Sequence, residues 1–124
     1  MKPLPAIYLA SQSPRRQQLL TQIGVSFELL LPSDPNEAEA LENVLPGEDP
    51  ENYVCRVTRL KLQAALARLK ERQGPSRPVL CADTTVALGR DILGKPQSVS
   101  EARAMLARLA GKTHRVLTAV AVQK

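Results

Sequence analysis

Short apolar runs alternate along the chain with longer segments in which apolar residues recur at helical spacing. Such runs are typical of buried strands, and the recurring spacing is typical of helices that bury one face. The runs predicted as strands are 6–10, 25–31, 79–88 and 113–122. The segments predicted as helices start at Pro14, at Pro50 and after Ser98, and end before Gly24, at about Arg72 and at Leu109.

Capping residues support these helix boundaries. Ser13 is a good N-cap, because its hydroxyl can accept a hydrogen bond from a free N–H of the first turn. Pro14 is a good first residue of the helix, because a backbone N–H at that position would have no partner within the helix. Gly24 stands where a helix commonly ends in a left-handed residue. Ser98 and Glu101 have the spacing of a capping box, which predicts the start of the last helix.

Two further segments connect these elements. The stretch 32–47 is acidic and contains three prolines, so it is predicted to be a solvated loop with a helical turn around 38–44. The residues Gly89-Arg90-Asp91 predict a tight turn into a short strand that ends at Leu93.

Strands separated by helices predict an α/β fold in which helices flank a sheet. The length of 124 residues predicts one domain, spanning 1–124. The sequence stops directly after the strand at 113–122, so we interpret the fold as incomplete at its C-terminus. We therefore expect self-association or marginal stability with reduced activity, through strand residues left partly exposed: Val116, Leu117, Ala119, Val120 and Val122.

Composition excludes several classes of protein. Apolar residues make up 44% and charged residues 23%, which is typical of globular rather than disordered chains. No apolar stretch is long enough to span a membrane, and the segment Met1–Pro5 does not resemble a secretory leader. The two cysteines, Cys55 and Cys81, are predicted to be reduced and in or near the core, and with the lone His114 they do not match a zinc site. These features predict a cytoplasmic protein.

Charge is unevenly distributed along the chain. The formal net charge is +5, yet residues 34–51 hold seven of the 12 acids and neither lysine nor arginine. The remaining residues carry all 17 basic side chains and are expected to attract phosphate-bearing partners. The three aromatic residues do not interleave with basic positions, so a stacking surface for nucleic acid is poorly supported.

The junction L-A-S-Q-S-P-R-R at 9–16 is a candidate anion site. A helix N-terminus presents free N–H groups, and Ser11, Ser13, Arg15 and Arg16 add further donors. A capped helix with two solvated arginines explains the same residues equally well.

Asp83 lies within an apolar strand, where an unpaired buried carboxylate is costly. Alternation to a solvated face is one explanation, and a general base or metal ligand is the other. Lys61 lies on the apolar side of the long helix, and Lys95 precedes a proline on a loop beside the hairpin. Together with the arginines, these residues suggest a polyphosphate-and-metal site, although no Walker-type or G-x-G-x-x-G motif occurs.

Five sequence blocks resemble the Maf (septum formation) family in their order and spacing. They are L-A-S-Q-S-P-R-R at 9–16, Y-V-C-R-V-T-R-L-K at 53–61, A-D-T-T-V at 82–86, G-K-P at 94–96 and L-A-G-K-T-H-R-V at 109–116. The resemblance covers the N-terminal part of the family's domain. It implies a Maf/Ham1 (ITPase)-like mixed sheet flanked by helices, with a deep cleft.

The resemblance also implies a nucleoside triphosphate pyrophosphatase that converts a triphosphate and water to the monophosphate and pyrophosphate. Asp83 would then accept the proton of the attacking water or bind a divalent cation, Mg²⁺ or Mn²⁺, for which Glu37 is the second candidate ligand. Phosphate binding would fall to Ser11, Arg15, Lys61 and Lys95. Arg16 and Thr84 match positions that distinguish a dTTP/UTP-cleaving branch from a 7-methyl-GTP branch, and the family's tendency to dimerise implies a homodimer.

A second hypothesis stays open beside this one. The same basic surface would suit a non-catalytic module that binds nucleotides or nucleic acid. Pyrophosphate release from dTTP or UTP distinguishes the two hypotheses, because only the first predicts turnover.

Overall fold

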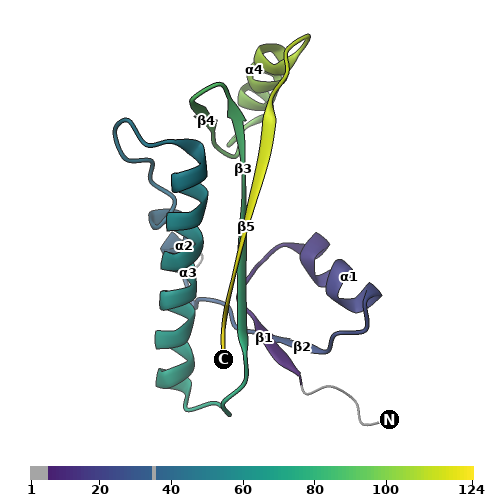
Figure 1. The fold of residues 1–124 in the computed structure, drawn as a ribbon, viewed down its shortest axis with the longest axis vertical. Helices are drawn as coiled ribbons and strands as arrows, with labels where there is room; N and C mark the ends of the chain where they lie inside the picture. Colours follow the sequence, from purple (N-terminus) through teal and green to yellow (C-terminus); the bar gives the residue numbers. More distant parts are fainter. Residues whose placement is uncertain (1–5, 35) are drawn as a thin grey trace.

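The structure, a computed structural model, describes residues 6–34 and 36–124. Strands and helices alternate over most of this length (Figure 1). The strands are β1 (Ile7–Leu9), β2 (Phe27–Leu29), β3 (Val79–Leu88), β4 (Asp91–Leu93) and β5 (Arg115–Gln123). The helices are α1 (Pro14–Gln22), α2 (Asn36–Ala40), α3 (Pro50–Arg72) and α4 (Val99–Leu109). The segment 1–5, on which the expectation about a leader rested, lies outside the described residues.

The strands described by the structure form one mixed sheet. β1 pairs in parallel with both β2 and β3, whereas β3 pairs antiparallel with β4 and β5. Figure 1 shows α3 along one side of the long β3–β5 pair and α1 on the other side. The prediction of an α/β fold with a mixed sheet flanked by helices is therefore confirmed.

The core lies between α3 and the sheet. Val57 on α3 and Leu9 on β1 have no exposed surface, and burial of each such side chain stabilises the fold by about 1.5–3 kcal/mol. The central cluster comprises Tyr8, Leu30, Ala65, Val79 and Cys81, with Leu62, Leu66 and Leu69 of α3 packed against it. This packing fixes the orientation of α3 relative to the sheet, and with it the positions of the polar side chains that α3 carries.

The helix boundaries follow the caps that the sequence contains. Ser13 accepts a hydrogen bond from the backbone N–H of Arg16, and Ser98 accepts one from that of Glu101. The carboxylate of Glu101 accepts from the backbone N–H of Gln97, one residue before the expected partner in a capping box. Gly24 has φ of 78°, the left-handed conformation that favours glycine at the end of a helix.

Three local expectations were wrong. The helical turn in the acidic segment is α2, which begins at Asn36 and ends at Ala40 rather than spanning 38–44. The strands β1 and β2 have three residues each and are shorter than their apolar runs, because pairing rather than hydropathy sets their ends. Cys55 is exposed, whereas Cys81 is buried, and this burial raises the pKa of its thiol to about 11.

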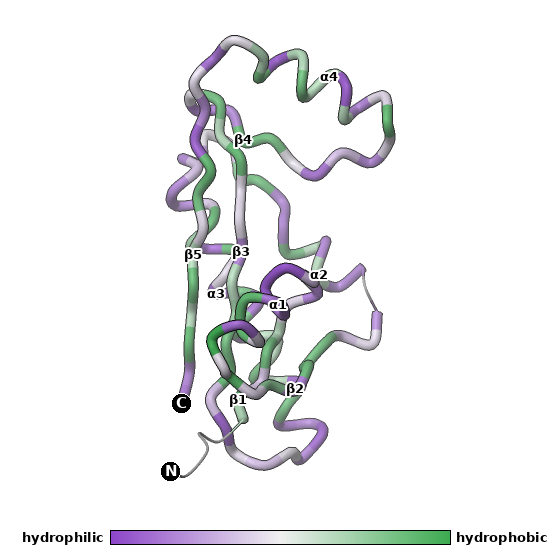
Figure 2. The backbone as a smooth tube through the Cα atoms, turned by 90° about the vertical axis from the view of Figure 1, so that its right-hand side faces the viewer, coloured by the Kyte–Doolittle hydropathy of each residue, from purple (hydrophilic) through white to green (hydrophobic). Residues whose placement is uncertain are grey.

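One face of β5 is apolar and exposed. Much of β5 is green in Figure 2, the colour of hydrophobic residues. Val116, Val120 and Val122 are 60%, 64% and 58% exposed, while the intervening residues Leu117 and Ala119 are half-buried. Alternate residues of a strand point to opposite faces of the sheet, and α3 packs against only one of these two faces.

None of the helices in the described part of the chain combines the length and hydropathy needed to cross a membrane.

Candidate functional site

A cavity of about 810 Å³ opens at the carboxyl end of β1. The residues that line it come from the loop after β1, from α1, from the acidic segment after β2, from α3 and β3, and from β4 and the loop after it. Seven residues singled out from the sequence are among them: Ser11, Ser13, Arg16, Glu37, Lys61, Asp83 and Lys95. Ser11 and Lys95, which are 84 positions apart in the chain (95 − 11), therefore share one cleft because of the sheet topology.

The strand order explains why a cleft forms at this place. β5 pairs with residues 79–87 of β3 along one edge. β1 pairs with 79–80 and β4 with 86–88, so these two short strands must share the opposite edge. Between them, among the described residues, no strand lies beside 81–85 on that edge, and Asp83 and Thr84 stand at this gap.

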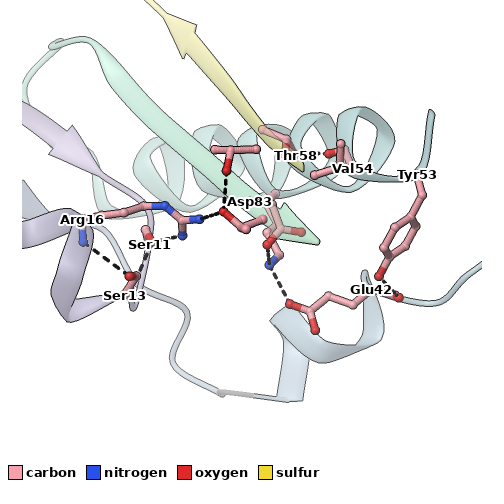
Figure 3. A network of polar contacts seen from close by, with 11 residues as sticks. Ser11, Ser13, Arg16, Glu42, Tyr53, Val54, Thr58 and Asp83 are labelled. Carbon is pink, nitrogen blue, oxygen red and sulfur yellow. Dashed lines mark hydrogen bonds and ion pairs between the residues drawn. The ribbon is translucent and has the colours of Figure 1, made fainter. Parts of the chain in front are cut away.

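The first corner of the cleft is a network around Arg16. Its guanidinium donates to Ser11 Oγ at 3.1 Å and to Thr84 Oγ1 at 3.0 Å. Ser11 Oγ also accepts from the backbone N–H of Ser13 (Figure 3). A positive charge in the first turn opposes the helix dipole, and these bonds offset that cost. The arginine is therefore held against the sheet and is not a freely solvated side chain.

Thr84 links Arg16 to the neighbouring strand. Its hydroxyl lies 2.9 Å from the hydroxyl of Thr118 on β5, and the register pairs these two residues directly. Cross-strand threonine pairs of this kind stabilise a sheet modestly. Thr84 also lines a second cavity of about 190 Å³ that shares Asp83 and Lys95 with the main cleft. The two residues matched to branch specificity, Arg16 and Thr84, thus contact one another.

The second corner is an ion-paired group around Lys61. The Lys61 ammonium donates to Glu42 Oε1 at 2.7 Å and lies 3.5 Å from Asp83 Oδ1. The side chains of Lys61 and Asp83 are only 17% and 13% exposed. Figure 3 shows the Glu42 and Asp83 carboxylates facing the same space from the acidic segment and from β3. Asp83 is therefore paired and does not point to a solvated face.

Side chains of α3 hold the acidic segment beside this corner. Tyr53 Oη donates to the backbone carbonyl of Glu42 at 2.6 Å, and burial together with the charges of Glu42 and Asp83 raises the pKa of Tyr53. Arg56 donates to the backbone carbonyl of Asn43 at 2.6 Å. Arg56 also pairs with the Glu48 carboxylate at 2.7 Å and thereby lowers the pKa of Glu48.

These contacts change the interpretation of the charge distribution. The acids of 34–51 are not separate from the basic surface, because several pair with basic side chains of the remaining chain. The pairs are Glu37 with Arg68, Glu42 with Lys61, Glu48 with Arg56 and Glu51 with Arg115. The positive field expected around the chain is therefore partly compensated within the fold, and the cleft contains charges of both signs.

The remaining candidates differ in their placement. Lys95 lines both cavities from the loop after β4. Arg15 is exposed on α1 and is not among the residues that line either cavity. Glu37 borders the main cleft, but its carboxylate is 61% exposed and lies 3.8 Å from Arg68.

Sequence reasoning missed Glu42 and Tyr53. Tyr53 precedes Lys61 by eight residues, so helical spacing places the two on related faces of α3, and this signal was present in the sequence. Glu42 carries no such signal, because its place opposite Lys61 depends on the path of an irregular loop.

The cleft has donors that suit a hard divalent cation. Carboxylate oxygens of Asp83, Glu37 and Glu42 border it, and Mg²⁺ is commonly held by one or two carboxylates plus phosphate oxygens and water. Within residues 6–34 and 36–124, however, no three acidic, histidine or cysteine side chains are grouped closely enough to form a cation site by themselves. The donor set therefore fits a cation that arrives with a phosphate ligand better than a closed protein site.

The chain belongs to the Maf-like protein family, because the sequence model of that family matches residues 6–124. The resemblance seen in the five sequence blocks is thereby confirmed.

Individual proteins that are similar to this chain share one name. A dTTP/UTP pyrophosphatase from Albidiferax ferrireducens is 65% identical over 116 residues, which make up 94% of this chain and 58% of that protein. Proteins of the same name from Cupriavidus pinatubonensis and Burkholderia pseudomallei are 60% and 61% identical, over 94% and 95% of this chain. The chain spans 56–58% of the length of these relatives.

Proposed function

We propose that this chain carries the active-site cleft of a nucleoside triphosphate pyrophosphatase that acts on dTTP and UTP. The observation that carries the proposal is the cleft itself, in which Lys61, Arg16 and Lys95 border the same space as the Asp83 carboxylate. Basic side chains in such a cleft can bind the phosphates of a triphosphate, and a carboxylate beside them can accept a proton from a reacting water. The names of the relatives supply the substrate class.

In this proposal, Asp83 removes a proton from the water that attacks the α-phosphorus. The bond between the α-phosphorus and the bridging oxygen breaks, and pyrophosphate leaves with the electron pair of that bond. Lys61, Lys95 and Ser11 bind phosphate oxygens, and Arg15, which is exposed on α1 and lines neither cavity, assists them. Positioned cations and hydroxyls stabilise the charge that develops on the phosphates during the reaction.

We propose that Asp83 and Glu37 would hold a divalent cation, Mg²⁺ or Mn²⁺. Such a cation neutralises phosphate charge and orients the polyphosphate. Lys61 neutralises only one of the two negative charges of Glu42 and Asp83, so one negative charge is left to balance part of the charge of such a cation.

Pyrophosphate release tests the proposed function. Incubation of the chain with UTP or dTTP and Mg²⁺ is expected to give monophosphate and pyrophosphate in equal amounts. Release of orthophosphate with a diphosphate would contradict the proposed bond cleavage. An absence of turnover, combined with duplex binding that weakens steeply with salt, would favour the non-catalytic binding module instead.

We expect selectivity for dTTP and UTP over 7-methyl-GTP, by roughly a hundredfold in kcat/KM, because a polar site rejects bases that leave its groups unpaired. Arg16 donates a hydrogen bond to Thr84, and these two residues are expected to determine the selectivity. Thr84→Val should therefore reduce the ratio, whereas Thr113→Val, at an exposed threonine in the loop before β5, should not. A preference of the unaltered chain for the methylated purine would show that the branch assignment is wrong.

We also propose that residues 1–124 belong to one Maf-like domain and that two copies associate through β5. The support is the exposed apolar stripe of Val116, Val120 and Val122, on a strand that has β3 as its one neighbour among the described residues. The two cysteines are free in the structure, and reduced cysteines are typical of cytoplasmic proteins, so we propose that compartment.

Sedimentation at micromolar concentration tests the association. The unaltered chain is expected to sediment as a dimer, and Val120→Glu is expected to give a monomer, because a charge replaces the middle of the exposed stripe. Val99→Glu is the matched control, since Val99 is 71% exposed on α4. A stable monomer of the unaltered chain would contradict the proposed association.

A further inference from the structure

The Lys61 ammonium lies between two carboxylates that it contacts unequally. It is 2.7 Å from Glu42 Oε1 and 3.5 Å from Asp83 Oδ1. All three side chains are mostly withdrawn from solvent, with 17% exposure for Lys61, 27% for Glu42 and 13% for Asp83. Solvent screens an ion pair less in such surroundings than at the surface. The position of the Lys61 ammonium therefore depends strongly on which of the two carboxylates attracts it more.

The backbone at Glu42 is held beside Lys61 by the same helix that carries Lys61. Tyr53 Oη donates to the Glu42 carbonyl, and Arg56 donates to the next carbonyl, that of Asn43. Both anchors lie on α3, within eight residues of Lys61 (counting from Tyr53). The helix α3 therefore carries Lys61 and also holds the backbone on either side of the Glu42 side chain.

We propose that Glu42 is a positioning residue that holds the Lys61 ammonium away from Asp83. An ammonium group shared by two carboxylates bonds more closely to the one that is better placed, and here that is Glu42. Asp83 then keeps only the longer contact of 3.5 Å with Lys61, and its carboxylate stays available to accept a proton from water or to bind a cation. This inference rests on the proposed function, since it assigns Glu42 a role in preparing Asp83 for that reaction.

Two other roles for Glu42 make different predictions. If Glu42 competed with phosphate for Lys61 and so inhibited binding, its removal would lower KM and leave kcat unchanged or raised. If it only stabilised the acidic segment, its removal would lower the melting temperature without changing the position of Lys61. The proposed positioning role predicts a lower kcat with little change in KM.

The first experiment is a crystal structure of the Glu42→Gln variant. Glutamine keeps the length of the side chain but removes its charge, so Lys61 is expected to move into a close ion pair with Asp83. The distance between Lys61 Nζ and Asp83 Oδ1 should fall from 3.5 Å to the range of charge-assisted bonds, about 2.7–2.9 Å. An unchanged distance overturns the inference.

The second experiment measures UTP hydrolysis by the same variant with Mg²⁺. We expect kcat to fall about tenfold while KM changes little, the pattern of an interaction that matters in the transition state. Glu42→Asp keeps the charge and should recover much of the loss. Glu39→Gln is the matched control, because Glu39 is an exposed acid that borders the same cleft and its change removes the same charge.

The two experiments separate this inference from the proposed function. If the unaltered chain releases no pyrophosphate, the proposed function fails, and the role in catalysis fails with it. If the unaltered chain is active but Glu42→Gln has an unchanged kcat, the inference alone is overturned. Thermal melting of each variant shows whether a loss of activity reflects unfolding.

Discussion

Asp83→Asn is expected to abolish pyrophosphate release while the chain stays folded. Asparagine has nearly the same shape as aspartate, but it neither accepts the proton of water nor binds a cation with a full charge. The loss of a general base alone lowers turnover by about 10²–10⁴-fold. Because Lys61 also pairs with Glu42, it keeps a carboxylate partner in the variant, so the fold is not left with an uncompensated buried charge. Pyrophosphate release with UTP and circular dichroism are the measurements.

Asp91→Asn is the control for this substitution. Asp91 begins β4, is 68% exposed and pairs with Arg108 of α4 at 2.8 Å, away from the cleft. The Asp91→Asn substitution should change turnover little. The exposed ion pair that it removes contributes at most about 1 kcal/mol to stability, so the variant is expected to stay folded. Turnover equal to that of the unaltered chain in a folded Asp83→Asn variant would refute the assignment of Asp83.

Local sequence signals predicted most of the fold. The start of α1 depends on Ser13 and Pro14, which act within one helical turn, and the ends of α3 and β3 were found for similar reasons. The acidic segment was less predictable, because its acids pair with basic residues later in the chain, such as Glu42 with Lys61 and Glu48 with Arg56. The same limit applies to the short strands β1 and β2, whose ends depend on pairing partners far along the chain.

Sequence reasoning grouped the candidate site residues partly through motifs and partly through the resemblance. No local pattern predicted that Arg16 would bond to Thr84, since the two are 68 residues apart and meet only because β1 and β3 are neighbours. The roles of these residues stay predictions, although the structure brings them together. Glu42 could not have been found from spacing, because a loop sets its position.

Lys61→Ala is expected to raise KM for UTP about tenfold to a hundredfold. A hydrogen bond to a charged group typically contributes about 1.5–3 kcal/mol, and the ammonium of Lys61 lies in the cleft at 3.5 Å from Asp83 Oδ1. Its removal also leaves the Glu42 and Asp83 carboxylates facing the same space without the cation that now lies between them. Both effects oppose the binding of a triphosphate. Steady-state kinetics over a range of UTP concentrations measures the change in KM.

Two further substitutions show whether the rise in KM is due to the loss of a positive charge, to the position of that charge in the cleft, or to the overall charge of α3. Lys61→Arg keeps a positive charge at the same place and should lose less affinity than Lys61→Ala, although its longer, planar head group does not reproduce the ammonium contacts. Lys70→Ala removes an exposed lysine from the last turn of the same helix and should leave KM unchanged. An equal rise in KM for Lys70→Ala would mean that the overall charge of α3, and not an ammonium in the cleft, attracts the substrate. An unchanged KM in a folded Lys61→Ala variant would remove Lys61 from the proposed phosphate site.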